Sequence, residues 1–218
     1  SINAYFEASI FQPSSTWINE FLSHQAEKEL TIKWRTESRA DALSTKQVEQ
    51  LARAGMKILD IGLESASPRQ LLNMEKTPNP SAYLRRASEL LKACHDNGIW
   101  TKVNVLLYPG ESEATIFETR NWLQQHAKFI KGVSVGPLIL YRYGSSTKEF
   151  LEKIKSQGAS EAIPGNLDKL GYSDLNISAD FSNKKAISTA LEISKELMSE
   201  RDYYDLKSFN YFKRNLNF

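Results

Sequence analysis

The chain has 218 residues, of which 41% are hydrophobic and 25% are charged, and its formal net charge is +2. This length can bury a full core, and so small a net charge gives no basis for a nucleic-acid partner. One cysteine, Cys94, excludes an internal disulfide and favours a reducing, cytoplasmic location. No run of about 18 apolar residues is present, so no membrane association is expected.

Apolar runs that alternate with helical patterns predict five strands along the first two thirds of the chain. We expect these strands at residues 2–6, 31–35, 57–63, 100–107 and 133–140. The last run is continuously apolar, as expected of a strand that is covered on both faces. The fold class is therefore α/β, with parallel βαβ units that form an open, partial TIM-type barrel.

Helix signals separate these strands. Ser15 or Thr16 is expected to cap the first helix, whose inward positions would be Trp17, Phe21 and Leu22. The later starts are a capping box at residues 44–47, Ser-Pro at 67–68, and positions near 81 and 113.

The remaining residues differ in character. We expect residues 1–144 to form the partial barrel and residues 145–218 to form a C-terminal extension. The extension would contain helices at 146–155 and 184–199, with an irregular segment at 158–183. The first strand would leave an exposed edge, which predicts a missing N-terminal segment or a partner that covers it.

Polar residues at the strand exits are the candidate site, because parallel strands bind ligands at their carboxyl ends. Glu64 and Ser65 follow the third strand, where a carboxylate can accept hydrogen bonds from ribose hydroxyls. An equally weighted alternative is that Glu64 caps the next helix or pairs with an arginine. Arg35, Glu37 and Arg39 suit an amino-acid head group, although a surface salt-bridge cluster is the commoner role for charges this dense.

The fourth strand ends in Tyr108-Pro109-Gly110-Glu111. A structural turn is the stronger interpretation, although adenine could lie against the Tyr108 ring. Cys94 lies on an apolar helical face and is expected to be buried and inert. With one cysteine and three histidines in predicted helices, neither a metal site nor a Ser-His pair is expected.

Four of these segments, taken in order, resemble one family. They are YFEASIF, IKWRTESRADALSTKQVEQLARAG, LDIGLESASPRQLLNMEK and VNVLLYPGESEATIFETRNWL. The region from Phe6 to about Leu140 is similar to the later part of the radical S-adenosylmethionine (radical SAM) fold. The likeness is greatest to the branch that includes methylthiotransferases and cobalamin-dependent members.

The resemblance implies a set of cofactor-binding residues. Glu64 and Ser65 match positions that contact the ribose of S-adenosylmethionine. Arg39, with Glu37, matches groups near the methionine carboxylate, and Glu7 matches a contact to the methionine amine.

The same resemblance implies that Asn104 to Tyr108, with the backbone near Pro137 and Leu138, borders the adenine. Tyr108 stands where the family usually has glycine, which affects the adenine packing. The family's three-cysteine motif, CxxxCxxC, is absent from the chain. Because three thiolates hold the [4Fe-4S] cluster, the chain as given would be catalytically incompetent.

The leading hypothesis is a radical SAM enzyme that lacks its first βα unit, and the Ser start fits a processed or excised chain. When complete, it would bind S-adenosylmethionine at the strand ends and generate a 5′-deoxyadenosyl radical. Its substrate, a small molecule or a peptide, is not identified. The alternatives are a degenerate, non-catalytic binding module and an unrelated enzyme that uses Glu64 or Glu111 as a general acid or base.

Overall fold

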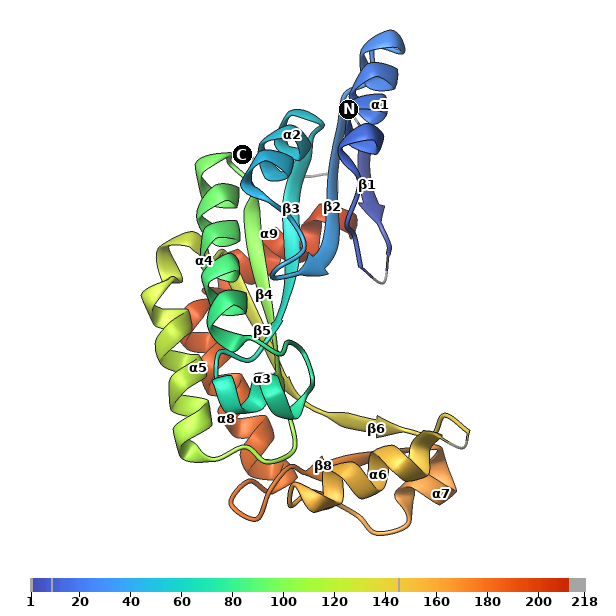
Figure 1. Cartoon of the computed structure of the whole chain (residues 1–218), viewed down its shortest axis with the longest axis vertical. Coiled ribbons are helices and arrows are strands. Elements are labelled where there is room, and N and C mark those ends of the chain that lie inside the picture. Colours follow the sequence, from blue (N-terminus) through green and yellow to red (C-terminus); the bar gives the residue numbers. More distant parts are fainter. Residues whose placement is uncertain (1, 9, 145, 212–218) are drawn as a thin grey trace.

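The structure, a computed structural model, describes residues 2–8, 10–144 and 146–211 and contains two β-sheets (Figure 1). The larger sheet is parallel throughout and has the strand order β1-β2-β3-β4-β5. Its strands are β1 (Ile2–Phe6), β2 (Ile32–Arg39), β3 (Met56–Glu64), β4 (Trp100–Leu107) and β5 (Gly132–Pro137). The expected α/β fold with five parallel strands is confirmed, and in the described residues the strands do not close into a ring.

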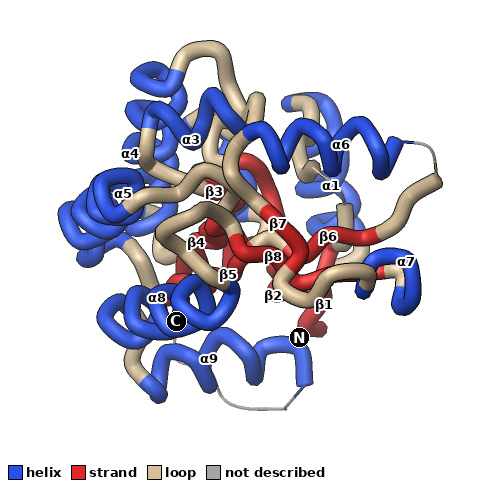
Figure 2. The backbone as a smooth tube through the Cα atoms, turned by 90° about the horizontal axis from the view of Figure 1, so that it is seen from below, coloured by secondary structure: helices blue, strands red, loops and turns tan. Residues whose placement is uncertain are grey.

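Five α-helices follow the strand exits and return the chain to the next strand. They are α1 (Ser15–Glu27), α2 (Thr45–Arg53), α3 (Pro68–Asn73), α4 (Pro80–Asp96) and α5 (Glu113–Gln125). The predicted capping box at residues 44–47 is present. In Figure 2, α3, α4 and α5 lie on one side of the parallel strands, while α9 (Glu200–Tyr211) lies on the other. We call the side that carries α9 the inner face.

The first helix begins one residue earlier than expected. Ser14 is the N-cap, and its hydroxyl accepts a hydrogen bond from the Trp17 backbone N–H. The inward face is correspondingly shifted, so that Ile18 is fully buried whereas Trp17 is 38% exposed. The prediction that Trp17 points inward was wrong, because Ile18 takes the buried position and Trp17 stacks on Phe21 beside it, with ring centroids 5.1 Å apart.

The predicted strand at 133–140 is two strands. β5 ends at Pro137, and β6 (Ile139–Tyr141) pairs with β8 (Tyr172–Asn176) in a small antiparallel sheet that also contains β7 (Ser160–Glu161). Ser134 is exposed, so the expectation that this strand is covered on both faces was also wrong. Pro137 has no backbone N–H to continue a ladder, which fits the end of β5 there.

The small antiparallel sheet lies near the carboxyl ends of the parallel strands, at the bottom of Figure 1. Two helices, α6 (Ser146–Ser156) and α7 (Asn166–Leu170), accompany it. The expectation of an irregular segment at 158–183 was therefore wrong, because this range holds β7, α7 and β8. The division of the chain into domains at residue 144 stays a prediction, and β6 pairs with a strand from beyond it.

The last two helices cover β5 and the inner face. α8 (Asn183–Leu197) packs along β5, and Leu206 of α9 packs on Ile58 of β3. Gly132 leaves room for this packing, because an added Cβ there would lie 2.6 Å from Leu206 Cδ1 and 2.7 Å from the Met198 sulfur, and these side chains would have to shift. Within the described residues, no helix has the length and apolar character needed to cross a bilayer.

Candidate functional site

Arg39 closes β2 and lies at the carboxyl edge of the sheet. Its Nε donates to Asp41 Oδ1 at 3.0 Å, and its Nη2 donates to the backbone oxygen of Lys76 at 2.9 Å. Asp41 therefore organises the loop, as the sequence suggested, while Arg39 reaches the segment that follows α3.

Glu64 closes β3 in an unusual backbone conformation. Its φ is +64°, and the β3–β4 register shifts between Gly62 and Glu64. The shift turns the carboxylate back over Gly62, where an added Cβ would lie 2.9 Å from Glu64 Oε1. A non-glycine residue at positive φ stores backbone strain, and such residues cluster at ligand sites.

Lys76 links these two strand exits. Its Nζ lies 3.0 Å from Glu64 Oε1, with the two side chains 16% and 26% exposed. Its position is fixed by a Schellman motif at the end of α3, in which Lys76 N donates to Leu71 O and Glu75 N donates to Leu72 O. The loop after α3 thus holds a cation against the β3 carboxylate, in a pair that stays partly open to solvent.

The β4 exit is buried. Tyr108 is 5% exposed, and burial raises the pKa of its hydroxyl. Glu111 is 3% exposed, and its burial raises the pKa of the carboxyl to about 7, although Thr115 Oγ1 donates a hydrogen bond to it. Between them, Gly110 N donates to Ile177 O at 2.8 Å, which fastens this loop to the chain just after β8. The expected turn is present.

The other predicted site residues fall into two groups. Asn104 and Glu37 join across the inner face through a hydrogen bond of 3.2 Å; in the sheet register Asn104 pairs with Gly62 and Glu37 with Asp60. Ser65 and Leu138 instead serve the framework: the buried Ser65 hydroxyl lies 3.0 Å from Thr119 Oγ1 of α5, and Leu138 N donates to Leu107 O. Glu7 is exposed beyond β1, beside residues 10–17.

Sequence reasoning named Arg35 for a head group or a surface salt bridge, but it missed the buried charged cluster to which Arg35 belongs, deeper on the inner face. Arg35 donates through Nε and Nη2 to Asp60 Oδ2, and through Nη1 to Leu206 O of α9. Lys102 Nζ lies 3.7 Å from Asp60 Oδ1. Arg35 and Asp60 are buried, at 8% and 3% exposed. The available signal was a lone aspartate within the apolar run of β3.

The described residues do not fit an iron-sulfur cluster. They contain no group of three or more histidine, cysteine or acidic side chains that could hold a metal ion. Cys94 is fully buried in α4, so the predicted burial is confirmed, and this burial raises the pKa of its thiol to about 12. A four-iron cluster needs several thiolates, and we therefore derive no chemistry through one.

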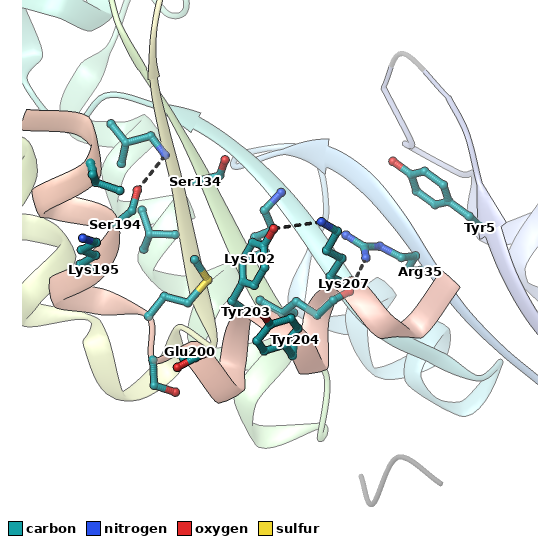
Figure 3. A pocket seen from close by; sticks show the side chains of 16 residues that line it. Tyr5, Arg35, Lys102, Ser134, Ser194, Lys195, Glu200, Tyr203, Tyr204 and Lys207 are labelled. Carbon is teal, nitrogen blue, oxygen red and sulfur yellow. Dashed lines mark hydrogen bonds between the residues drawn. The ribbon is translucent and has the colours of Figure 1, made fainter. Parts of the chain in front are cut away.

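A cavity of about 810 Å³ opens elsewhere on the inner face, between β5 and the last two helices (Figure 3). None of the eight predicted site residues lines it. The strand exits and this cavity are thus separate places.

Comparison with known proteins identifies the fold. Residues 16–123 match the family model of the radical SAM superfamily. The chain is similar to the radical S-adenosylmethionine methyltransferase TsrM from Kitasatospora setae, solved with cobalamin and a [4Fe-4S] cluster. The TM-score is 0.70 at 15% identity, over 93% of this chain and 44% of that one. No curated protein matches the chain.

Two further solved structures are similar over smaller parts. Coproporphyrinogen III oxidase (HemN) from Escherichia coli gives a TM-score of 0.52 at 10% identity, over 82% of this chain and 49% of that one. Elp3 from Methanocaldococcus infernus gives 0.50 at 16% identity, over 76% and 34%. The chain spans less than half the length of each of these three proteins.

Proposed function

The chain carries a radical SAM superfamily region at residues 16–123, and on this premise we propose that it supplies the S-adenosylmethionine-binding exits of a radical SAM enzyme. The observation that carries the proposal is the partly exposed Glu64–Lys76 pair at a strained strand exit. It lies where parallel βα folds bind ligands.

Glu64 would accept hydrogen bonds from the vicinal ribose hydroxyls. A carboxylate can accept two such bonds, and Lys76 would then hold it in place from the other side. Both side chains are partly exposed, so a ligand could reach them without breaking into the core.

Arg39 and Glu37 would bind the methionine end. Arg39 presents a cation to the carboxylate, while Glu37, exposed and held by Asn104, presents an anion to the amine. The adenine would lie towards Leu138 and the β4 exit. Because Tyr108 is buried, its ring would pack beneath the adenine site and would not offer an exposed face for stacking. Ser65 would support the ribose subsite through α5, and Glu7 would act only from the β1 edge.

Reductive cleavage of the cofactor to a 5′-deoxyadenosyl radical is the chemistry that a [4Fe-4S] cluster supplies in this family. We propose that its thiolate ligands come from residues outside this sequence, in a segment or partner that also covers β1. The chain's own contribution is to bind and orient the cofactor. The reaction's substrate stays open.

Titration with S-adenosylhomocysteine, followed by amide shifts in nuclear magnetic resonance spectra, tests the binding site. Shifts are expected at residues 62–65, 76 and 104, and Glu64→Gln should weaken binding about tenfold through loss of a charge-assisted hydrogen bond. Glu75→Gln is the matched control, since Glu75 also has positive φ and carries a nearby charge but is 77% exposed. No shifts, or an equal effect of both variants, would contradict the proposal.

Anaerobic purification of the entire gene product that contains this chain separates the enzyme from the alternative, a degenerate binding module. Iron content and 5′-deoxyadenosine formation are measured with S-adenosylmethionine and a reductant. An enzyme should contain iron and form 5′-deoxyadenosine, whereas a degenerate binding module should do neither.

A further inference from the structure

The cavity beside β5 lies on the inner face and is lined by none of the predicted strand-exit residues. Its sheet wall comes from the amino-terminal half of β5 (133–135) with Lys102 and Arg35, and its other wall comes from α8 and α9 (Figure 3). Lys102 pairs in register with Gly132, the first residue of β5. Ser134 in turn pairs with Asn104, so the cavity extends from near the start of β5 to the row of Asn104. Its volume of about 810 Å³ falls within the range of small-molecule pockets.

Cationic groups dominate the polar lining. Arg35, Lys102, Lys195 and Lys207 line the cavity, against the single carboxylate of Glu200. Asp60 contacts Arg35 and Lys102 without lining the cavity itself. When its charge is included, the four cations still outnumber the two carboxylates. Asp60 binds Arg35 closely, whereas Lys102 Nζ stays 3.7 Å from its nearest oxygen and is 29% exposed. That ammonium can therefore donate into the cavity.

Aromatic and apolar side chains form the rest of the lining. Tyr203 and Tyr204 of α9 lie edge to face, with ring centroids 5.4 Å apart, and are 42% and 50% exposed. Leu191 and Met198 continue this surface along α8 and its end. Exposed rings beside apolar side chains suit a planar, apolar body, and Lys207 Nζ lies 3.0 Å from the Tyr203 hydroxyl at the rim.

We propose that this cavity binds an organic anion with a planar apolar body, such as an aromatic carboxylate, sulfonate or phosphate. The anionic head lies towards Lys102 and Lys195, and the ring lies against Tyr203 and Met198. This site goes beyond the proposed function, because none of the strand-exit residues lines it, although Ser134 neighbours Asn104 in the sheet.

Fluorescence titration of the full chain with anilinonaphthalene sulfonate tests the proposal, with the uncharged phenylnaphthylamine as the matched ligand. One saturable site is expected, and the uncharged dye should bind about tenfold more weakly, since it lacks the charge-assisted contacts. Ser134→Trp, on the exposed part of β5, should abolish binding by filling the cavity. Lys195→Met should weaken it about threefold, as expected for an exposed cation, whereas Lys46→Met on α2 should not change it.

Three results would overturn the proposal: equal affinity for the two dyes, many weak sites, or unchanged binding in a folded Ser134→Trp variant. Thermal unfolding establishes that each variant is folded. If Ser134→Trp does not fold, Lys195→Met decides the test, and unchanged binding in that variant would overturn the proposal. The shifts that S-adenosylhomocysteine causes at residues 62–65 should survive Lys195→Met, since Lys195 lies on α8 and not in the sheet, so the two proposals fail separately.

Discussion

Charged side chains occur at two levels of the inner face, and the fold treats the two levels differently. In the amino-terminal half, Arg35 and Asp60 are buried and are closed over by α9. At the strand exits, Glu64 and Lys76 remain partly exposed and are held by a single loop. Parallel βα folds place stability at the amino ends of their strands and ligands at the carboxyl ends. An acidic and a basic side chain therefore form a buried structural ion pair at one level, and a partly exposed pair that solvent can reach at the other.

Removing one charge at each level is the strongest test of this contrast. Asp60→Asn should lower the free energy of unfolding by about 3–5 kcal/mol, because it leaves the Arg35 cation buried without a counter-charge. Glu64→Gln should cost less than about 1 kcal/mol, as a partly exposed pair does. Urea unfolding measures both. Equal losses would show that the two levels are not distinct.

Glu111 is the exception to the division, since it is a buried carboxyl at the exit end. Its pKa is raised to about 7 in the folded protein, above the ordinary 4.5, so the folded state favours the protonated form. The stability that this proton provides is complete below about pH 4.5 and is lost as pH rises through about 7.

Glu111→Gln should therefore match the parent at about pH 4 and become more stable by about 3 kcal/mol near pH 8. Urea unfolding across this pH range measures the difference. A difference that does not vary with pH would show that Glu111 does not titrate in this way.

The loop that carries Lys76 offers the smallest effect. Glu75 holds φ +55° at the end of α3, where glycine is the preferred residue. Glu75→Gly should raise stability by up to about 1 kcal/mol through relief of left-handed strain. Thermal unfolding measures this gain, and binding of S-adenosylhomocysteine should not change. A loss of stability would mean that the ion pair of Glu75 with Lys153 outweighs the strain.

The sequence allowed much of the parallel sheet to be predicted. The bounds of β1 and β4 agree with the expected strands, because each is a short apolar run with clear helix signals nearby. The small antiparallel sheet was missed because β6 continues the apolar run of β5. Pro137 is the one local signal that separates the two strands. The assignment of β6 to the second sheet depends on its pairing with β8, which lies more than 30 residues later in the sequence.

The site was predictable by position but not by partner. The levels of Glu64, Arg39 and Asn104 follow from the parallel topology. The role of Lys76 depends on a six-residue helix and its Schellman ending, which the sequence pattern alone did not reveal. Ser65 follows Glu64 directly, yet its hydroxyl faces α5, because the register shift at Glu64 changes the direction of the chain.

The hydrogen bond from Arg35 to the Leu206 carbonyl joins residues 171 positions apart. During synthesis on a ribosome, which releases the amino-terminal part first, Arg35 emerges long before its last acceptor exists. The Arg35 guanidinium cannot complete this set of hydrogen bonds until residue 206 has been synthesised. Docking of α9 therefore follows synthesis of the sheet, and a nascent chain stalled before residue 206 should leave Arg35 more open to solvent and the inner face more open to proteases.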